Sequence, residues 1–131
     1  MSMKPRIGVG LALMLCPALA VAEVHTKQVL VGYKCMMLAQ QWDGEGPVPP
    51  PVPVYNGPGP GSAQVGIAGG TVIVPVSGAP VGGRISMVFP DGRKVWIDAS
   101  QIVPWRAKAD PTAACRPVLL SNGRYGTDGG Y

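Results

Sequence analysis

The chain has 131 residues, with 11 Lys or Arg against 7 Asp or Glu, and a formal net charge of +4. Two of the basic residues, Lys4 and Arg6, lie within the first 22 residues, so the rest of the chain is only weakly basic. This balance argues against a nucleic-acid partner, which usually requires a clustered basic stripe. The length allows one small domain behind a leader segment.

Residues 1–22 have the pattern of an export signal. The two basic residues are followed by an apolar run over residues 7–19 and by a small-residue cleavage site that ends at Ala22. The apolar run is shorter than the about 20 residues of a membrane span, so we expect no span after signal removal. Lipid attachment at Cys16 is the alternative, disfavoured by the bulky leucine before it. We expect an exported protein, periplasmic or extracellular.

The remaining cysteines, Cys35 and Cys115, predict a disulfide, because an even pair in an exported protein is typically oxidised. The bond would close a loop of about 80 residues, worth on the order of 4 kcal/mol by chain entropy. A metal or redox pair is the alternative. It lacks both a C-x-x-C spacing and a histidine partner.

Residues 23–51 form an expected N-terminal extension with a Pro-rich linker. We expect its polar start, through Gln28, to be frayed. Apolar stretches at 29–31 and 33–38 suit short strands, while Met36 to Gln41 also has the composition of a helix, so both readings stay open there.

The linker itself, residues 43–53, reads D-G-E-G-P-V-P-P-P-V-P and contains two overlapping P-x-x-P patterns. Consecutive prolines favour polyproline II geometry. The segment is either a docking peptide for an aromatic groove or a stiff spacer. The spacer is favoured because no adjacent basic residue would fix the orientation of a docked peptide.

Residues 52–105 carry short β-branched runs separated by turn residues. This density predicts an all-β fold built on a small closed or half-closed barrel. Within it, Asp91-Gly92 predicts a type I′ hairpin. That register would place Met87 opposite Trp96 and Val88 opposite Val95.

Residues 106–131 form an expected C-terminal extension, which the predicted disulfide joins to the N-terminal one. Its start is polar up to Cys115, and Pro117 to Leu120 would add a strand or cover a sheet edge. We expect a flexible tail from Gly123 to Tyr131, because the segment is rich in glycine and polar residues.

The ordered motifs of residues 52–105 resemble the bacterial SH3 (SH3b) family. The matching pieces are Val54-Tyr55-x-Gly57-Pro58, Val65-Gly66, Gly70-Thr71-Val72-x-Val74 and Asp91-Gly92-Arg93-x-Val95-Trp96-Ile97-x4-Ile102. The resemblance implies a small SH3-like barrel of five to seven strands in an exported or envelope protein that binds cell wall or protein. The chain departs from the pattern at Arg84, where the family usually has Trp, and at Val95, where it usually has Gly.

Catalysis is not expected from this composition. The single histidine, His25, lies near the start of the mature chain, so nucleophilic schemes lack a positioned base. Asp43 and Glu45 sit in a Gly/Pro loop without an apolar wall that would raise the pKa of either carboxyl group. We expect no cofactor and no metal.

The aromatic residues favour a binding module. Tyr55, Trp96 and Trp105 lie in or beside the barrel region, with Trp42 upstream, and this supply predicts an exposed aromatic surface. Arg84 would form its polar rim. The expected partner is an envelope protein or peptidoglycan, left undecided. A structural or assembly role in the envelope, without a small-molecule or glycan ligand, is the alternative.

Overall fold

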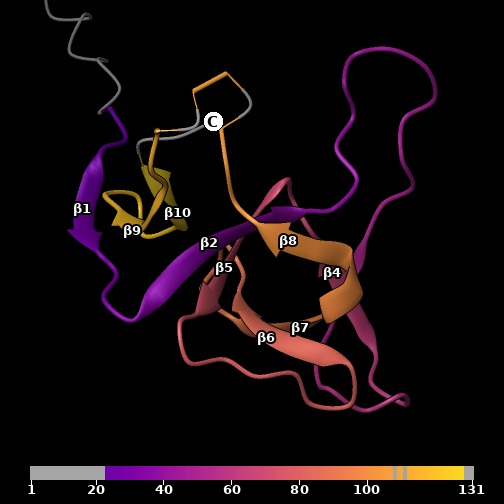
Figure 1. The fold of residues 1–131 in the computed structure, drawn as a ribbon. Coiled ribbons are helices and arrows are strands. Elements are labelled where there is room, and N and C mark those ends of the chain that lie inside the picture. Colours follow the sequence, from indigo (N-terminus) through magenta and orange to yellow (C-terminus); the bar gives the residue numbers. More distant parts are fainter. Residues whose placement is uncertain (1–22, 108, 111, 129–131) are drawn as a thin grey trace, which may run out of the picture.

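The computed structural model describes residues 23–107, 109–110 and 112–128, so the expected signal at 1–22 lies outside the described residues. The described chain forms two antiparallel sheets, which confirms the all-β class (Figure 1). None of its helices is long and apolar enough to cross a membrane. The elements are β1 (Thr26–Val29), β2 (Tyr33–Leu38), β3 (Pro53–Tyr55), β4 (Gln64–Ile67), β5 (Thr71–Pro75), β6 (Arg84–Val88), β7 (Lys94–Asp98), the 3-10 helix η2 (Ala99–Gln101), β8 (Ile102–Pro104), β9 (Arg116–Leu120) and β10 (Tyr125–Asp128).

The larger sheet has seven strands in the order β4-β3-β7-β6-β5-β2-β8 and curves around one core (Figure 1). In β6 and β7 every second residue is buried, the period expected of strands with one face on a core. In β5 the middle residue Ile73 is buried as well, and it pairs with Cys35, where the link to the smaller sheet begins. The core side chains are Val52, Val54, Ala68, Val72, Val74, Ile85, Met87, Val95, Ile97 and Ile102.

The seven-stranded sheet does not close. Its end strands are β4, which pairs with β3, and β8, which pairs with β2, and the two ends are not hydrogen-bonded to each other. Both β3 and β8 are only three residues long, and β8 ends at Pro104, which has no amide hydrogen to extend a ladder. In the part of the chain that the structure describes, no sheet forms a barrel, so an SH3-like form of the fold stays a proposal.

The larger sheet begins earlier in the chain than the expected boundary at Val52. β2 lies between β5 and β8, and Met36 stands opposite Val72 on one side and opposite Pro104 on the other. The segment from Met36 that suited helix or strand is therefore strand as far as Leu38. Sequence periodicity missed this role, because a strand that pairs on both sides with distant segments carries no local turn signal.

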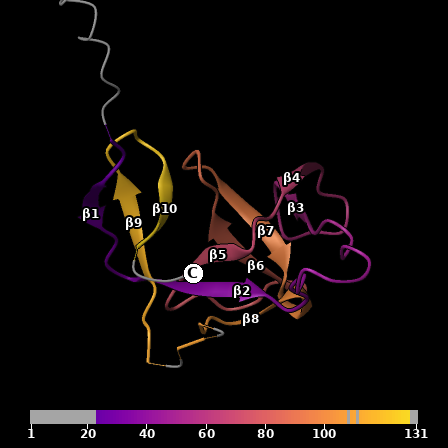
Figure 2. The same cartoon turned by 90° about the horizontal axis from the view of Figure 1, so that it is seen from above.

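The smaller sheet has the order β1-β9-β10 and lies beside the larger one (Figure 2). The strand expected from Pro117 to Leu120 is β9. The expectation of a flexible tail was wrong for residues 125–128, which form β10. Residues 129–131 lie outside the described part. The expectation of a frayed start was likewise wrong for the residues that form β1. Both strands are held by pairing with β9, a tertiary interaction that their polar composition does not reveal.

The β6–β7 hairpin is present, but its expected register was wrong by one residue. Met87 stands opposite Val95, and Trp96 stands opposite Ser86. The turn begins earlier than expected because the Gly92 amide donates to the Phe89 carbonyl, which makes Pro90 and Asp91 the central residues. Gly92 follows with φ of 92°, so the loop has three residues instead of two. Met87 consequently points into the core, and Trp96 lies on the outer face.

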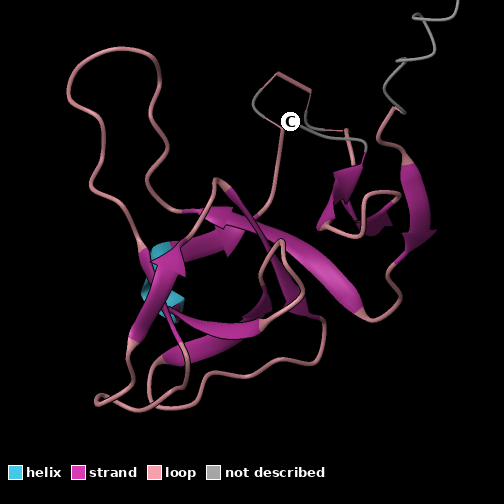
Figure 3. Ribbon diagram, turned by 180° about the vertical axis from the view of Figure 1, so that it is seen from behind, coloured by secondary structure: helices cyan, strands magenta, loops and turns pink. Residues whose placement is uncertain are grey.

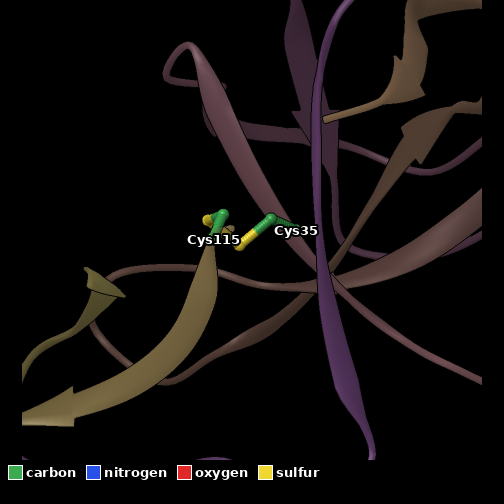
Figure 4. Close-up of a disulfide and its surroundings, with 2 residues drawn as sticks. All are labelled: Cys35 and Cys115. Carbon is green, nitrogen blue, oxygen red and sulfur yellow. A yellow bond between two sulfur atoms is a disulfide. The ribbon is translucent and has the colours of Figure 1, made fainter. Parts of the chain in front are cut away.

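The Cys35–Cys115 disulfide is present and links the two sheets (Figure 4). Cys35 lies in β2 of the larger sheet, and Cys115 directly precedes β9 of the smaller one, with 6.1 Å between their Cα atoms. The expected covalent joint between the two ends of the chain is therefore confirmed.

Candidate binding surfaces

The structure places three of the four expected site residues on one face. Tyr55 stands opposite Trp96 across the β3–β7 ladder, and Arg84 stands opposite Asp98 across the β6–β7 ladder. Since directly paired residues, and residues two apart on a strand, share a face, these side chains lie together on the outer surface of the larger sheet. We call Tyr55, Arg84 and Trp96 the outer cluster.

Arg84 is occupied by contacts within the chain. Its Nε donates to the Asp98 carboxylate at 3.0 Å, its Nη1 donates to the Gly59 carbonyl at 2.8 Å, and its guanidinium stacks 3.6 Å from the centroid of the Tyr55 ring. Only 13% of the side chain is exposed. These contacts fasten the Gly/Pro loop that follows β3 to the face of the sheet, so Arg84 has a structural use whether or not it also contacts a ligand.

Trp96 is half-buried in the outer cluster, with the Lys94 ammonium 5.2 Å from its ring centroid. A cation at this distance interacts with the negative face of an indole. The chain's own cations therefore lie over two aromatic rings of this face, Tyr55 and Trp96. The outer cluster presents little bare aromatic surface to a ligand.

Trp105 lies elsewhere, in a groove on the outer face of β2 and β8. The groove has a volume of about 620 Å³. Met37 and Val103 form its floor, because they stand opposite each other in the β2–β8 ladder. We call this feature the aromatic groove; its lining residues are Met37, Ala39, Gln41, Trp42, Asp43, Gly70, Thr71, Val103, Trp105 and Arg106.

The two indoles of the aromatic groove come from distant parts of the chain. Trp42 follows β2, is 53% exposed, and donates from Nε1 to the Gly46 carbonyl at 3.2 Å. Trp105 follows β8. Asp43 and Arg106, the residues directly after the two tryptophans, supply one charge of each sign to the groove. Sequence reasoning noted Trp42 only as part of the aromatic supply, because placing it beside Trp105 requires the pairing of β2 with β8.

A second hollow, of about 330 Å³, lies between the two sheets. Ile73, Val88 and Phe89 line it from the larger sheet and its hairpin, and Tyr125 lines it from β10. Thr71 borders both this hollow and the aromatic groove. The second hollow is smaller, and only the aromatic groove is lined by tryptophan.

Three titratable side chains among the described residues make local contacts. His25 is exposed, and its Nδ1 lies 3.2 Å from the Glu23 carbonyl oxygen. The pKa of Asp91 is lowered mainly by the hydrogen bond from the Arg93 amide, and the pKa of Asp110 is lowered by hydrogen bonds from Thr112. Both are local turn contacts. Among the described residues, no three His, Cys, Asp or Glu side chains are grouped so as to hold a metal ion.

Comparison of the chain with protein-family models, with curated proteins and with solved structures finds no match. The resemblance to the SH3b family rests on the chain's own motifs.

Proposed function

We propose that the protein is a non-enzymatic, exported SH3b-like binding module that engages an envelope protein or a cell-wall component through the aromatic groove. The observation that carries the proposal is that Trp42 and Trp105 line the same open groove. In the sequence, Trp42 follows the first strand of the larger sheet and Trp105 follows the last. Aromatic rings with an apolar body and a polar edge are the usual anchors of binding sites that remain partly exposed to water.

The SH3-like part of the proposal is supported by the strand count and the single core. The resemblance implies five to seven strands, and seven strands share one set of buried side chains. The most specific motif, from Asp91 to Ile102, spans the hairpin turn, β7, η2 and the first residue of β8. Export is supported by the signal pattern of residues 1–22 and by the disulfide, since such bonds persist in oxidising compartments.

The groove suits ligands that present flat apolar surfaces and a few polar groups. A protein segment in an extended conformation fits this description, and so does a sugar ring. We favour a protein partner, because Asp43 and Arg106 supply one charge of each sign beside the indoles. No cofactor or metal takes part in this function.

A structural or assembly role in the envelope is the second candidate. It is favoured by the exposed proline-rich loop between β2 and β3, in which Val48 is 70% exposed. In this role the loop, and not the groove, would make the principal contact.

The Trp105→Ala variant tests the proposal in pull-downs on purified peptidoglycan sacculi and on envelope protein fractions. Trp96→Ala is the matched control, since it removes the same ring from the outer cluster, and circular dichroism checks that both variants fold. Binding that falls with Trp105→Ala and persists with Trp96→Ala supports the aromatic groove. The reverse pattern would move the site to the outer cluster, and unchanged binding in both variants would refute an aromatic site.

A further inference from the structure

The loop between β2 and β3, residues 39–52, protrudes from the body of the protein (Figure 3). Its second half contains Pro47, Val48 and Pro50, all exposed, and forms no regular secondary structure. In polyproline II geometry every third residue shares an edge, so Pro47 and Pro50 would form one ridge with Val48 beside it. Long loops without secondary structure are uncommon in compact domains and are often binding loops.

The loop does not fill its own aromatic groove. The Trp42 indole donates to the Gly46 carbonyl at 3.2 Å, and the Glu45 amide donates to the Asp43 carboxylate at 2.9 Å. These bonds close a turn just before the proline run. Of this loop, the groove is lined by residues only as far as Asp43. The proline run therefore lies outside the groove, and the groove is open to another chain.

The loop and the groove have complementary chemistry. Proline-rich segments bind in grooves lined by aromatic side chains, and their fixed backbone loses little entropy on docking. Trp42 and Trp105 supply the aromatic walls. Glu45 precedes the prolines, and Arg106 borders the groove, so a loop docked from another molecule with Glu45 on the Arg106 side, away from Asp43, would bring opposite charges together.

We propose that the groove of one copy binds the proline-rich loop of a second copy, and that the two copies form a two-fold symmetric dimer. The inference concerns the same groove as the proposed function, so the loop of the second copy and an envelope partner would compete for it. The loop starts at the edge of the groove, at Trp42 and Asp43. A single two-fold axis near this point allows both reciprocal contacts to form at once, as in other isologous interfaces.

Sedimentation of the purified, oxidised protein over a range of concentrations tests the dimer. We expect an average mass that rises from monomer toward dimer. Trp105→Ala in the groove and Val48→Asp in the loop should each weaken association about thirtyfold, the loss typical of a hot-spot residue. The matched controls are Trp96→Ala, on another face, and Val76→Asp, at a valine that is 57% exposed. Both controls should associate like the parent.

Mixing the two variants tests the reciprocal geometry. A pair of Trp105→Ala and Val48→Asp molecules retains one intact groove facing one intact loop, so the mixture should associate more strongly than either variant alone. A synthetic peptide of residues 43–53 should compete with dimer formation and change the tryptophan fluorescence of the parent. If Trp105→Ala fails to fold, Val48→Asp and the peptide still decide the question.

A protein that stays monomeric at all concentrations, or a dimer that neither variant weakens, would overturn the inference. If the monomer still binds envelope fractions through Trp105, the groove serves a different proline-rich or extended partner and only the dimer is refuted. If dimerisation depends on Trp105 while pull-downs from sacculi and envelope fractions do not, the dimer stands and the proposed function fails.

Discussion

The guanidinium of Arg84 lies 3.6 Å from the centroid of the Tyr55 ring, which joins β6 to β3 across the intervening strand β7. The same group bonds Asp98 and the Gly59 carbonyl, so one side chain secures two strands and a loop. The planar, delocalised guanidinium is suited to stacking and donating at the same time, and an ammonium group is not.

Arg84→Lys should therefore lower the free energy of unfolding by about 1–2 kcal/mol, the sum expected from a lost stacking contact and a lost charged hydrogen bond. Urea denaturation measures the change. Arg93→Lys is the matched control, because Arg93 pairs with Asp91 while both side chains are more than 40% exposed. That control should change stability by less than about 0.5 kcal/mol. Equal effects of the two variants would show that Arg84 does not act as a joint.

Gly92→Ala should destabilise the protein for two reasons. Gly92 has φ of 92°, which is strained for a residue with a side chain, and a Cβ atom there would lie 3.1 Å from the Tyr125 ring. Gly123→Ala separates these reasons, since Gly123 has φ of 84° and open space around it. We expect about 1 kcal/mol for Gly123→Ala and more for Gly92→Ala, within the range of about 1–3 kcal/mol for such backbone strain. Thermal unfolding of both variants measures the difference, and a larger loss at Gly123 would contradict the packing of β10 on the hairpin tip.

The Cys35→Ser, Cys115→Ser double variant should lose about 4 kcal/mol of stability, as expected for opening a loop of 80 residues. Because the bond joins the two sheets, amides of β9 and β10 should lose more protection from hydrogen exchange than those of β6 and β7. Reduction of the parent protein serves as the control and should reproduce both effects. Uniform loss of protection would mean that the two sheets unfold as one unit even without the bond.

Stability should decline in acid partly through Asp91. The Arg93 amide lowers the pKa of Asp91 below its usual value of 3.8. The contribution of this carboxylate is therefore present above that value and is lost as the pH falls through the lower pKa of the folded state. Asp91→Asn keeps an oxygen acceptor for the amide but cannot titrate, so its urea midpoint should vary less with acid pH. A parallel pH profile in parent and variant would exclude Asp91 as a contributor.

Export predicts a defined covalent form. Mass spectrometry of the protein recovered from outside the cytoplasm should give a chain that starts at Glu23 and lacks the two thiol hydrogens of Cys35 and Cys115. A retained leader or free thiols in that material would contradict the export proposal. A lipid-modified chain that begins at Cys16 would replace cleavage after Ala22 with membrane anchoring.

The sequence predicted features that depend on local chemistry. The hairpin at Asp91-Gly92 follows from its turn residues. The disulfide followed from cysteine number. The hairpin register could not be predicted, because Pro90 and Gly92 allow a three-residue loop as readily as a two-residue one. A register shift of one residue moves Trp96 and its neighbours to the opposite faces of the sheet.

The candidate site was less predictable than the fold. Tyr55 and Trp96 could be brought together from the barrel motifs, but the aromatic groove depends on β2 pairing with β8. Trp42 and Trp105 are more than 60 residues apart, and neither lies in a strand. Alternation assigns a residue to a face only within a strand, so it could not place these two indoles side by side.

The position of β2 also determines when the chain can fold. β1 pairs with β9, β2 pairs with β8 as well as with β5, and Cys35 bonds Cys115, so the first described strands depend on partners in the last part of the chain. Contacts of such large sequence separation form slowly, because loop closure precedes any gain from pairing. During synthesis β1 therefore has no partner until β9 is made, and the groove comes into existence only when synthesis has passed Arg106, the last residue that lines it.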